Sequence, residues 1–238
     1  MEKFAFILHP LSLQDMEHLS PLMRYIPDPI IEACLKMKKP FKVSHITGIK
    51  SPYAEAEGWF IGCPLTAKQM VELPEEFVMD RIIESGKVAQ ELGAKIVGLG
   101  AFTSIVGDAG ITVAKNLDIA VTSGNSYTVA TAIQGTKQAA RMMGKDLKEC
   151  RAVVVGATGS IGAASVRLLA KEVKHITLVA RHMGPLEELA QELIEKNHCE
   201  VAVSQDIRTS LQEADIVITV TSALDFLIEP GDLKPGAV

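Results

Sequence analysis

The alternation of apolar and polar positions is clearest in the second half of the chain, from Arg151 onward. Short continuous apolar runs, typical of strands buried on both faces of a parallel sheet, are separated by segments with apolar residues at helical spacing. Strands that alternate with helices indicate an α/β fold with a doubly wound parallel sheet. The predicted strands are 152–155, 176–180, 200–203 and 216–220, and the predicted helices are 161–170, 185–196 and about 209–213.

The first half alternates strands and helices with weaker signals. Its clearest helix starts at Pro74-Glu75-Glu76, because proline and acidic residues suit a first turn, and it ends at Gly93. A second long helix, rich in Ala and Met, covers 126–143 and ends at Gly144. The predicted strands of this half are 4–8, 42–47, 96–100 and 118–122.

These patterns predict two domains. A smaller α/β substrate domain covers 1–145, and its last helix links it to a nucleotide-binding domain over 146–238. The final residues, 233–238, are typical of a turn that enters a further strand, and sheets of this kind usually carry at least one more strand. We therefore expect the second domain to be incomplete at its C-terminus.

A glycine-rich loop, Gly156-Ala-Thr-Gly159-Ser-Ile-Gly162, stands between a predicted strand and a predicted helix. In that context the glycines predict a Rossmann-type dinucleotide site: the first permits the tight turn, the second the approach of the pyrophosphate, and the third close helix–strand packing. The N–H groups of Ser160 and Ile161, at the helix N-terminus, favour an anion. The spacing departs from the common G-x-G-x-x-G, and such glycines can be purely structural, but the complete strand–loop–helix context favours binding.

The end of the second strand of this domain bears on the choice of cofactor. An NAD enzyme typically carries an acid there, whereas this strand ends in Arg181-His182, with no acid before Glu187. A guanidinium suits a 2′-phosphate, so we favour NADP(H) over the alternative of a solvated arginine. Small hydroxyl residues at the end of the fourth strand suit the nicotinamide ribose but are also ordinary loop residues. The predicted cofactor-binding residues are Gly156, Thr158, Gly159, Ser160, Ile161, Gly162, Arg181, Thr219, Thr221 and Ser222.

Composition excludes several classes of function. A net charge of −5, with no Lys/Arg run longer than Lys38-Lys39, argues against nucleic acid. The six histidines show no ligand spacing and the four cysteines form no CxxC pair, so we expect no metal. The first apolar run is too short for a signal peptide and none is long enough to span a bilayer. We therefore expect a soluble, cytoplasmic protein.

Three segments of the chain resemble the long-chain acyl-[acyl-carrier-protein] reductases, which are grouped with predicted amino-acid dehydrogenases and, more remotely, with shikimate dehydrogenase-like proteins. The segments are 98–106, 122–128 (Thr-Ser-Gly-Asn-Ser-Tyr-Thr), and 155–162 followed by Leu-Val-Ala-Arg at 178–181. The second is the most discriminating, since many dehydrogenases share the glycine loop. The resemblance implies NADPH-dependent reduction of a fatty acyl thioester to an aldehyde through a cysteine-bound intermediate. The cysteine of that family lies C-terminal to the nucleotide-binding domain, beyond Val238.

The catalytic residues stay open. Asn125 and Ser104 follow predicted strands and could polarise a carbonyl, although Asn125 also suits a tight turn. Cys63 stands in a loop-like Gly-Cys-Pro segment, whereas Cys34 lies in an apolar helical pattern that indicates simple burial. We favour the hypothesis that none of the four cysteines (Cys34, Cys63, Cys150, Cys199) forms an acyl-enzyme.

Three hypotheses for the function are therefore carried forward. The first is an NADP(H)-dependent oxidoreductase acting on an acyl group carried by acyl-carrier protein or CoA. The second is a shikimate- or amino-acid-type dehydrogenase acting on a small polar substrate. The third is a non-catalytic NADP(H) sensor. An apolar cleft would favour the first and a small basic one the second. The oligomeric state stays open, a homo-oligomer included.

Overall fold

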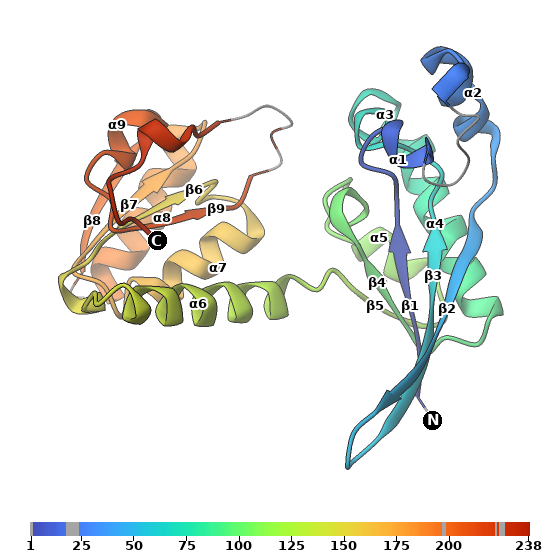
Figure 1. The fold of residues 1–238 in the computed structure, drawn as a ribbon, viewed down its shortest axis with the longest axis horizontal. Helices are drawn as coiled ribbons and strands as arrows, with labels where there is room; N and C mark the ends of the chain where they lie inside the picture. The colour runs from blue at the N-terminus through green and yellow to red at the C-terminus, as the bar shows by residue number, and fades with distance from the viewer. Residues whose placement is uncertain (1, 18–23, 197–198, 222, 224–226) are drawn as a thin grey trace. The chain divides into compact units, whose positions relative to one another are not determined.

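The computed structural model describes residues 2–17, 24–196, 199–221, 223 and 227–238 (Figure 1). The chain divides into two compact units, Met1–Gly124 and Asn125–Val238. This division lies before the long helix α6 (Asn125–Met142), whereas the sequence analysis placed the boundary after it, at 145/146. The reason is that α6 packs along α7 (Ser160–Leu169) and so belongs to the second unit.

The first unit is a five-stranded sheet in the order β2-β3-β1-β4-β5. The inner strands run parallel to one another, and β2 at the edge is antiparallel to β3. Its strands are β1 (Glu2–Leu8), β2 (Phe41–Lys50), β3 (Glu55–Gly62), β4 (Ile96–Leu99) and β5 (Ala120–Thr122). Its helices are α1 (Gln14–Glu17), α2 (Asp28–Met37), α3 (Ala67–Glu72), α4 (Glu75–Glu91) and α5 (Ile111–Lys115), with a short 3-10 turn, η2 (Ala101–Ser104).

The core of the first unit lies on one face of this sheet. Ala5 and Ile7 of β1 are buried there beneath α4, together with the single tryptophan, Trp59, which is 7% exposed. The alternate residues of β1 point to the other face, where Phe6 is 42% exposed. The ring of Phe6 lies over the backbone of Gly98, where a Cβ atom would approach it to 2.4 Å.

The second unit is a four-stranded, fully parallel sheet in the order β8-β7-β6-β9 (Figure 1). Helices α7 and α8 connect β6 to β7 and β7 to β8, and α9 connects β8 to β9. This confirms the predicted α/β fold with a doubly wound parallel sheet. The strands are β6 (Arg151–Val155), β7 (His175–Val179), β8 (Glu200–Ser204) and β9 (Ile216–Thr219), and the other helices are α8 (Met183–Lys196) and α9 (Ile207–Leu211).

Both faces of the second sheet are covered by apolar side chains. Alternate residues of β6, such as Val154, join a large core with α6, α7 and α8. Their neighbours Val153 and Val155 pack with Leu211 of α9 on the opposite face. Burial on both faces explains why these strands are continuous apolar runs in the sequence.

The last residues of the chain return to the start of β9. Asp215 accepts hydrogen bonds from Lys145 and Lys234 and from the backbone N–H of Arg151. Val238 donates its N–H to the carbonyl of Asp215 and accepts from the N–H of Val217, at 2.9 and 2.7 Å. The segment 233–238 therefore ends in hydrogen bonds at the β9 edge of the sheet.

Candidate functional site

A cavity of about 260 Å³ opens at the carboxyl ends of the strands of the second unit. In open α/β sheets, ligands bind at this edge. Four segments form the cavity: the glycine loop after β6, the residues after β7, the turn after β8, and the segment after β9. Its lining residues are Val155, Gly156, Thr158, Gly159, Val179, Ala180, Arg181, His182, Gln205, Ile207, Val220, Thr221, Ala223 and Leu227.

Two of the three loop glycines are required by the backbone itself. Gly156 has φ +85°, and a Cβ atom there would lie 2.1 Å from the carbonyl oxygen of Val220. A Cβ atom at Gly162 would lie 2.1 Å from the carbonyl oxygen of Gly156, so this glycine lets α7 pack against the turn. Gly159 differs, because its φ is −70° and a Cβ atom would find its nearest neighbour at 3.3 Å. The local fold therefore tolerates a side chain at Gly159 better than at the other two.

The N-terminus of α7 points its first backbone N–H groups away from the helix. Gly159 is the N-cap residue and makes no side-chain capping bond, so the helix start offers donors and the positive end of its dipole to an anion. The hydroxyl of Ser160, the first helical residue, accepts a hydrogen bond of 3.0 Å from the amide of Asn125. The glycine loop is thus tied to the start of α6.

The lining of the cavity includes a permanent positive charge, that of Arg181. Arg181 and His182 line it, and none of the described residues that line it is an aspartate or glutamate. The closest acid along the chain after β8, Asp206, caps α9 instead: its carboxylate accepts from the backbone and the hydroxyl of Thr209. These hydrogen bonds hold the pKa of Asp206 below its ordinary value.

Gln205 is a lining residue that sequence reasoning missed. Its side-chain amide donates to the carbonyl of Arg181 at 2.6 Å and so joins the turn after β8 to the segment after β7. A single glutamine before a helix cap carries no recognisable signal, and only the parallel pairing of β7 with β8 brings it to Arg181.

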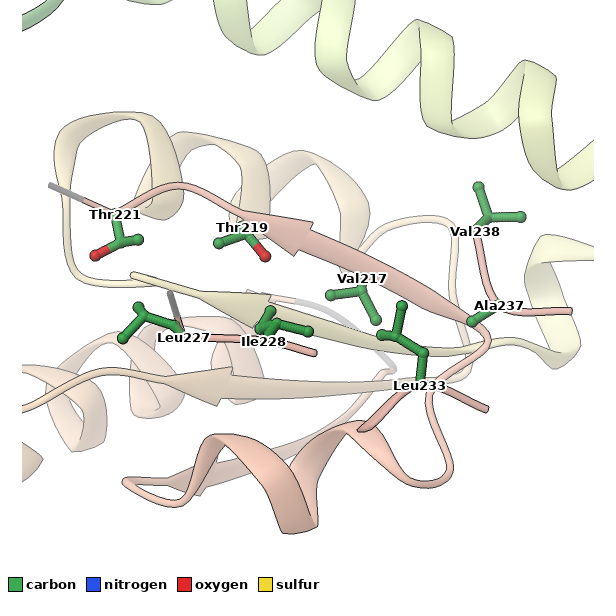
Figure 2. A pocket seen from close by; sticks show the side chains of 8 residues that line it. All are labelled: Val217, Thr219, Thr221, Leu227, Ile228, Leu233, Ala237 and Val238. Atoms are coloured by element: carbon green, nitrogen blue, oxygen red, sulfur yellow. The ribbon is translucent and has the colours of Figure 1, made fainter. Parts of the chain in front are cut away.

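Of the predicted cofactor residues, Gly156, Thr158, Gly159, Arg181 and Thr221 line this cavity, whereas Ser160, Ile161 and Gly162, in the first turn of α7, do not. Thr219 does not line the cavity itself but a neighbouring groove of about 430 Å³, which shares Thr221 and Leu227 with it. Figure 2 shows Val217 and Thr219 pointing from β9 toward Ile228 and Leu233 across this groove. Ser222 lies outside the described residues.

The weak catalytic candidates fall in different places. Cys63 has no exposed surface, and burial raises the pKa of its thiol to about 11, against a smaller opposing effect from Ser85. Cys63 does lie in the loop after β3, as its sequence setting predicted, but its side chain packs in the core of the first unit. Ser104 donates to the carbonyl of Ala101 at 2.7 Å. Asn125 is helical, and the left-handed turn falls on Gly124, with φ +73°.

The other cysteines divide by burial. Cys34 is exposed, so the expectation that it is buried was wrong; Ile31 and Leu35 fill the inner face of α2 instead. Cys150 and Cys199 are buried, which raises the pKa of both thiols. Within the described ranges, no group of three His, Cys, Asp or Glu side chains is arranged to hold a metal ion. In the same ranges, no helix combines the length and apolarity needed to cross a membrane.

Comparison with known proteins shows what the segment that forms this cavity resembles. Residues 137–237 match the family Shikimate / quinate 5-dehydrogenase. The chain is 31% identical, over 83% of its length, to aminotransferase PigE of a Serratia species, of which it spans only 22%. It is 26% identical, over 99% of its length, to the long-chain acyl-[acyl-carrier-protein] reductase of Synechococcus elongatus, of which it spans 70%. Among solved structures, the shikimate 5-dehydrogenase of Listeria monocytogenes is 13% identical, with a TM-score of 0.34 over 93% of this chain and 68% of that one.

The matched segment contains β6, the glycine loop, Arg181 and β9, which are the parts that build the cavity. This match to a dehydrogenase family supports an oxidoreductase. The resemblance inferred from the sequence is confirmed: residues 137–237 match the shikimate / quinate 5-dehydrogenase family, and the whole chain is distantly similar to the long-chain acyl-[acyl-carrier-protein] reductase.

Proposed function

We propose that this protein is an NADP(H)-dependent oxidoreductase that reduces a fatty acyl thioester, carried by acyl-carrier protein or CoA, to an aldehyde. The observation that carries the cofactor assignment is the cavity itself, which pairs an uncapped helix N-terminus with Arg181 and contains no carboxylate among its described lining residues. The substrate class rests on the similarity to the acyl-[acyl-carrier-protein] reductase, which extends over nearly the whole chain.

Each part of the cavity has a distinct task in this proposal. The backbone N–H groups at the start of α7 bind the pyrophosphate, and Gly159 leaves room for its approach. The forked donors of Arg181 bind the 2′-phosphate. Thr221, two residues after β9, lines the cavity and would contact the nicotinamide ribose. The bound nicotinamide would supply a hydride to the acyl carbon.

The acyl-enzyme step is not assigned to a cysteine of this segment. A thioester-accepting thiol needs a lowered pKa and an open approach, and three of the four cysteines are buried with raised pKa values. The exposed Cys34 lies on α2 of the first unit. We propose that residues 1–238 bind NADPH without forming an acyl-enzyme.

A second candidate is a dehydrogenase of a small polar substrate. The observation that favours it is the family match, which names shikimate and quinate and covers the whole cavity segment. A polar substrate would need charged partners beside the nicotinamide. The groove next to the cavity is lined mainly by aliphatic side chains, which favours the acyl substrate.

Calorimetric titration with NADPH and NADH tests the cofactor, and equal affinities would reject the NADP(H) assignment. Incubation with palmitoyl-CoA followed by intact-protein mass spectrometry tests the thiols, with Cys34→Ser and Cys63→Ser as matched variants. We expect no stoichiometric adduct that depends on Cys63.

Spectrophotometric assay of NADP⁺ reduction with shikimate and quinate tests the second candidate. NADPH binding with turnover of neither substrate class in a longer chain would favour the sensor.

A further inference from the structure

Asn125 and Ser160 meet although they are far apart in the sequence. Asn125 is the first residue of α6 and Ser160 the first of α7, and a hydrogen bond of 3.0 Å runs from the Asn125 Nδ2 to the Ser160 Oγ. The two helices pack along each other, and Lys137 further along α6 forms an ion pair of 2.7 Å with Glu172, just beyond the end of α7. The first residues of the two helices are in contact, and so are residues near their last turns. The helices therefore run parallel, with their N-termini next to each other.

The direction of this hydrogen bond determines where the proton of the serine hydroxyl points. An amide NH₂ can only donate, so the Ser160 oxygen is the acceptor. A hydroxyl that accepts through one lone pair keeps its own proton to donate elsewhere. Ser160 is exposed at the start of α7, where a ligand can reach this hydroxyl. The hydroxyl therefore has a donor ready for a ligand at the helix start.

We propose that Asn125 is a positioning residue for the cofactor: it holds the Ser160 hydroxyl so that its proton is donated to the pyrophosphate. This rests on the proposed cofactor site and adds a residue to it. In this arrangement the Asn125 amide donates to the Ser160 hydroxyl, which donates to a phosphate oxygen. Consecutive hydrogen bonds polarise one another, so each strengthens the next. The parallel N-termini of α6 and α7 add their dipoles at the same point. Asn125 therefore acts on the cofactor through Ser160 and does not contact the reacting atoms itself.

Substitutions at the two residues, read by NADPH titration, test this chain of donors. Ser160→Ala should weaken NADPH binding about tenfold, because it removes a hydrogen bond to a charged group. Asn125→Ala should weaken it by about three- to tenfold, because the hydroxyl is then free to turn away. Asn125→Asp should weaken NADPH binding more. The carboxylate would accept a hydrogen bond from the Ser160 hydroxyl, which could then no longer donate to the pyrophosphate, and its negative charge would repel the pyrophosphate.

The decisive measurement is the double variant. In the Ser160→Ala background, Asn125→Ala should have no further effect, because the group through which it acts is gone. Adenosine 2′-monophosphate, which lacks the pyrophosphate, should bind equally to the parent and to Asn125→Ala. Gln134→Ala, which removes an exposed amide from the same helix, is the matched control and should leave NADPH binding unchanged.

Several results would overturn the proposal. The first is an NADPH affinity of Asn125→Ala within twofold of the parent. The second is that Asn125→Ala weakens NADPH binding as much in the Ser160→Ala background as in the parent. The third is that Asn125→Ala weakens the binding of adenosine 2′-monophosphate as much as that of NADPH. If the parent binds NADPH but the variants give any of these three results, the cofactor site stands and the positioning role of Asn125 fails. If the parent binds no NADPH, both fail together. Thermal melting of each variant separates lost binding from lost folding.

Discussion

The two sheets of this protein differ in how many faces they bury. In the second unit, β6 sends Val154 into one core and Val153 and Val155 into another, so the sheet is closed on both sides. In the first unit, β1 buries Ala5 and Ile7 but leaves Phe6 and Leu8 about two-fifths exposed on the opposite face. A sheet that packs against a core on each face holds the ends of its strands in place, and the candidate site lies at those strand ends. The first unit has its main core on one face of its sheet, with a small separate cluster of Ile31, Leu35 and Leu13.

The largest expected effect separates two glycines of the same loop. Gly156→Val should destabilise the second unit by about 3 kcal/mol or more, because it combines a left-handed φ with a clash against the backbone carbonyl of Val220, just after β9. Gly159→Val should keep the fold but lose NADPH binding, since its Cβ atom meets only one atom, at 3.3 Å. Calorimetric melting beside NADPH titration measures both effects. Retained binding in Gly159→Val would contradict the proposed pyrophosphate approach.

A second pair of substitutions compares the two faces of β1. Ile7→Ala should cost about 2–5 kcal/mol, because it leaves a cavity in the main core. Phe6→Ala should cost clearly less, since that side chain is already 42% exposed. Urea unfolding of each variant gives the two free energies of unfolding. Equal costs would show that the outer face of this sheet is covered in solution.

The next prediction concerns affinity rather than stability. Arg181→Ala should lose about 1.5–3 kcal/mol of NADPH binding, the range for a hydrogen bond to a charged group, with little change for NADH. Titration of both cofactors to the parent and the variant checks this. A parallel loss for NADH would mean that Arg181 supports the loop rather than the 2′-phosphate.

The smallest effect concerns the ion pairs at the opposite edge of the second sheet. Burial raises the pKa of Asp215, but hydrogen bonds from Lys234, Arg151 and Lys145 outweigh burial and bring it to about 2. A carboxylate with a lowered pKa stabilises the folded state above its ordinary value near 3.8, and this contribution is lost as the pH falls toward 2. Asp215→Asn should therefore cost about 1–2 kcal/mol at pH 7 and almost nothing at pH 2. The same cost at both values, in urea unfolding at each pH, would argue against the assigned charge.

The difference between the two sheets also explains what the sequence could and could not predict. Strands β6 to β9 were predictable because each is a short run rich in apolar residues, and β6 in the middle of the sheet is buried on both faces. Strand β3 was not, because Glu55, Glu57 and Gly58 give it a poor strand composition. It forms because β1 and β2 pair with it on either side, which overrides intrinsic preference.

The candidate site shows the same limit. The glycine loop and Arg181 are local signals, readable from their place between one strand and the next element. Gln205 and Asn125 are not, since each acts on a residue at least 24 positions away. Cys34 was misjudged because Ile30, Ile31, Cys34 and Leu35 span two faces of α2, and spacing alone does not say which face is inward.

The position of the single tryptophan makes the two units optically separable. Trp59 stands in β3 of the first unit, stacked on His45 with ring centroids 5.4 Å apart. Emission excited at wavelengths that only indole absorbs therefore originates in the first unit. The dihydronicotinamide chromophore, if it binds as proposed, would report the second unit at a longer wavelength. One sample can thus reveal which unit unfolds first, without labels and without dividing the chain.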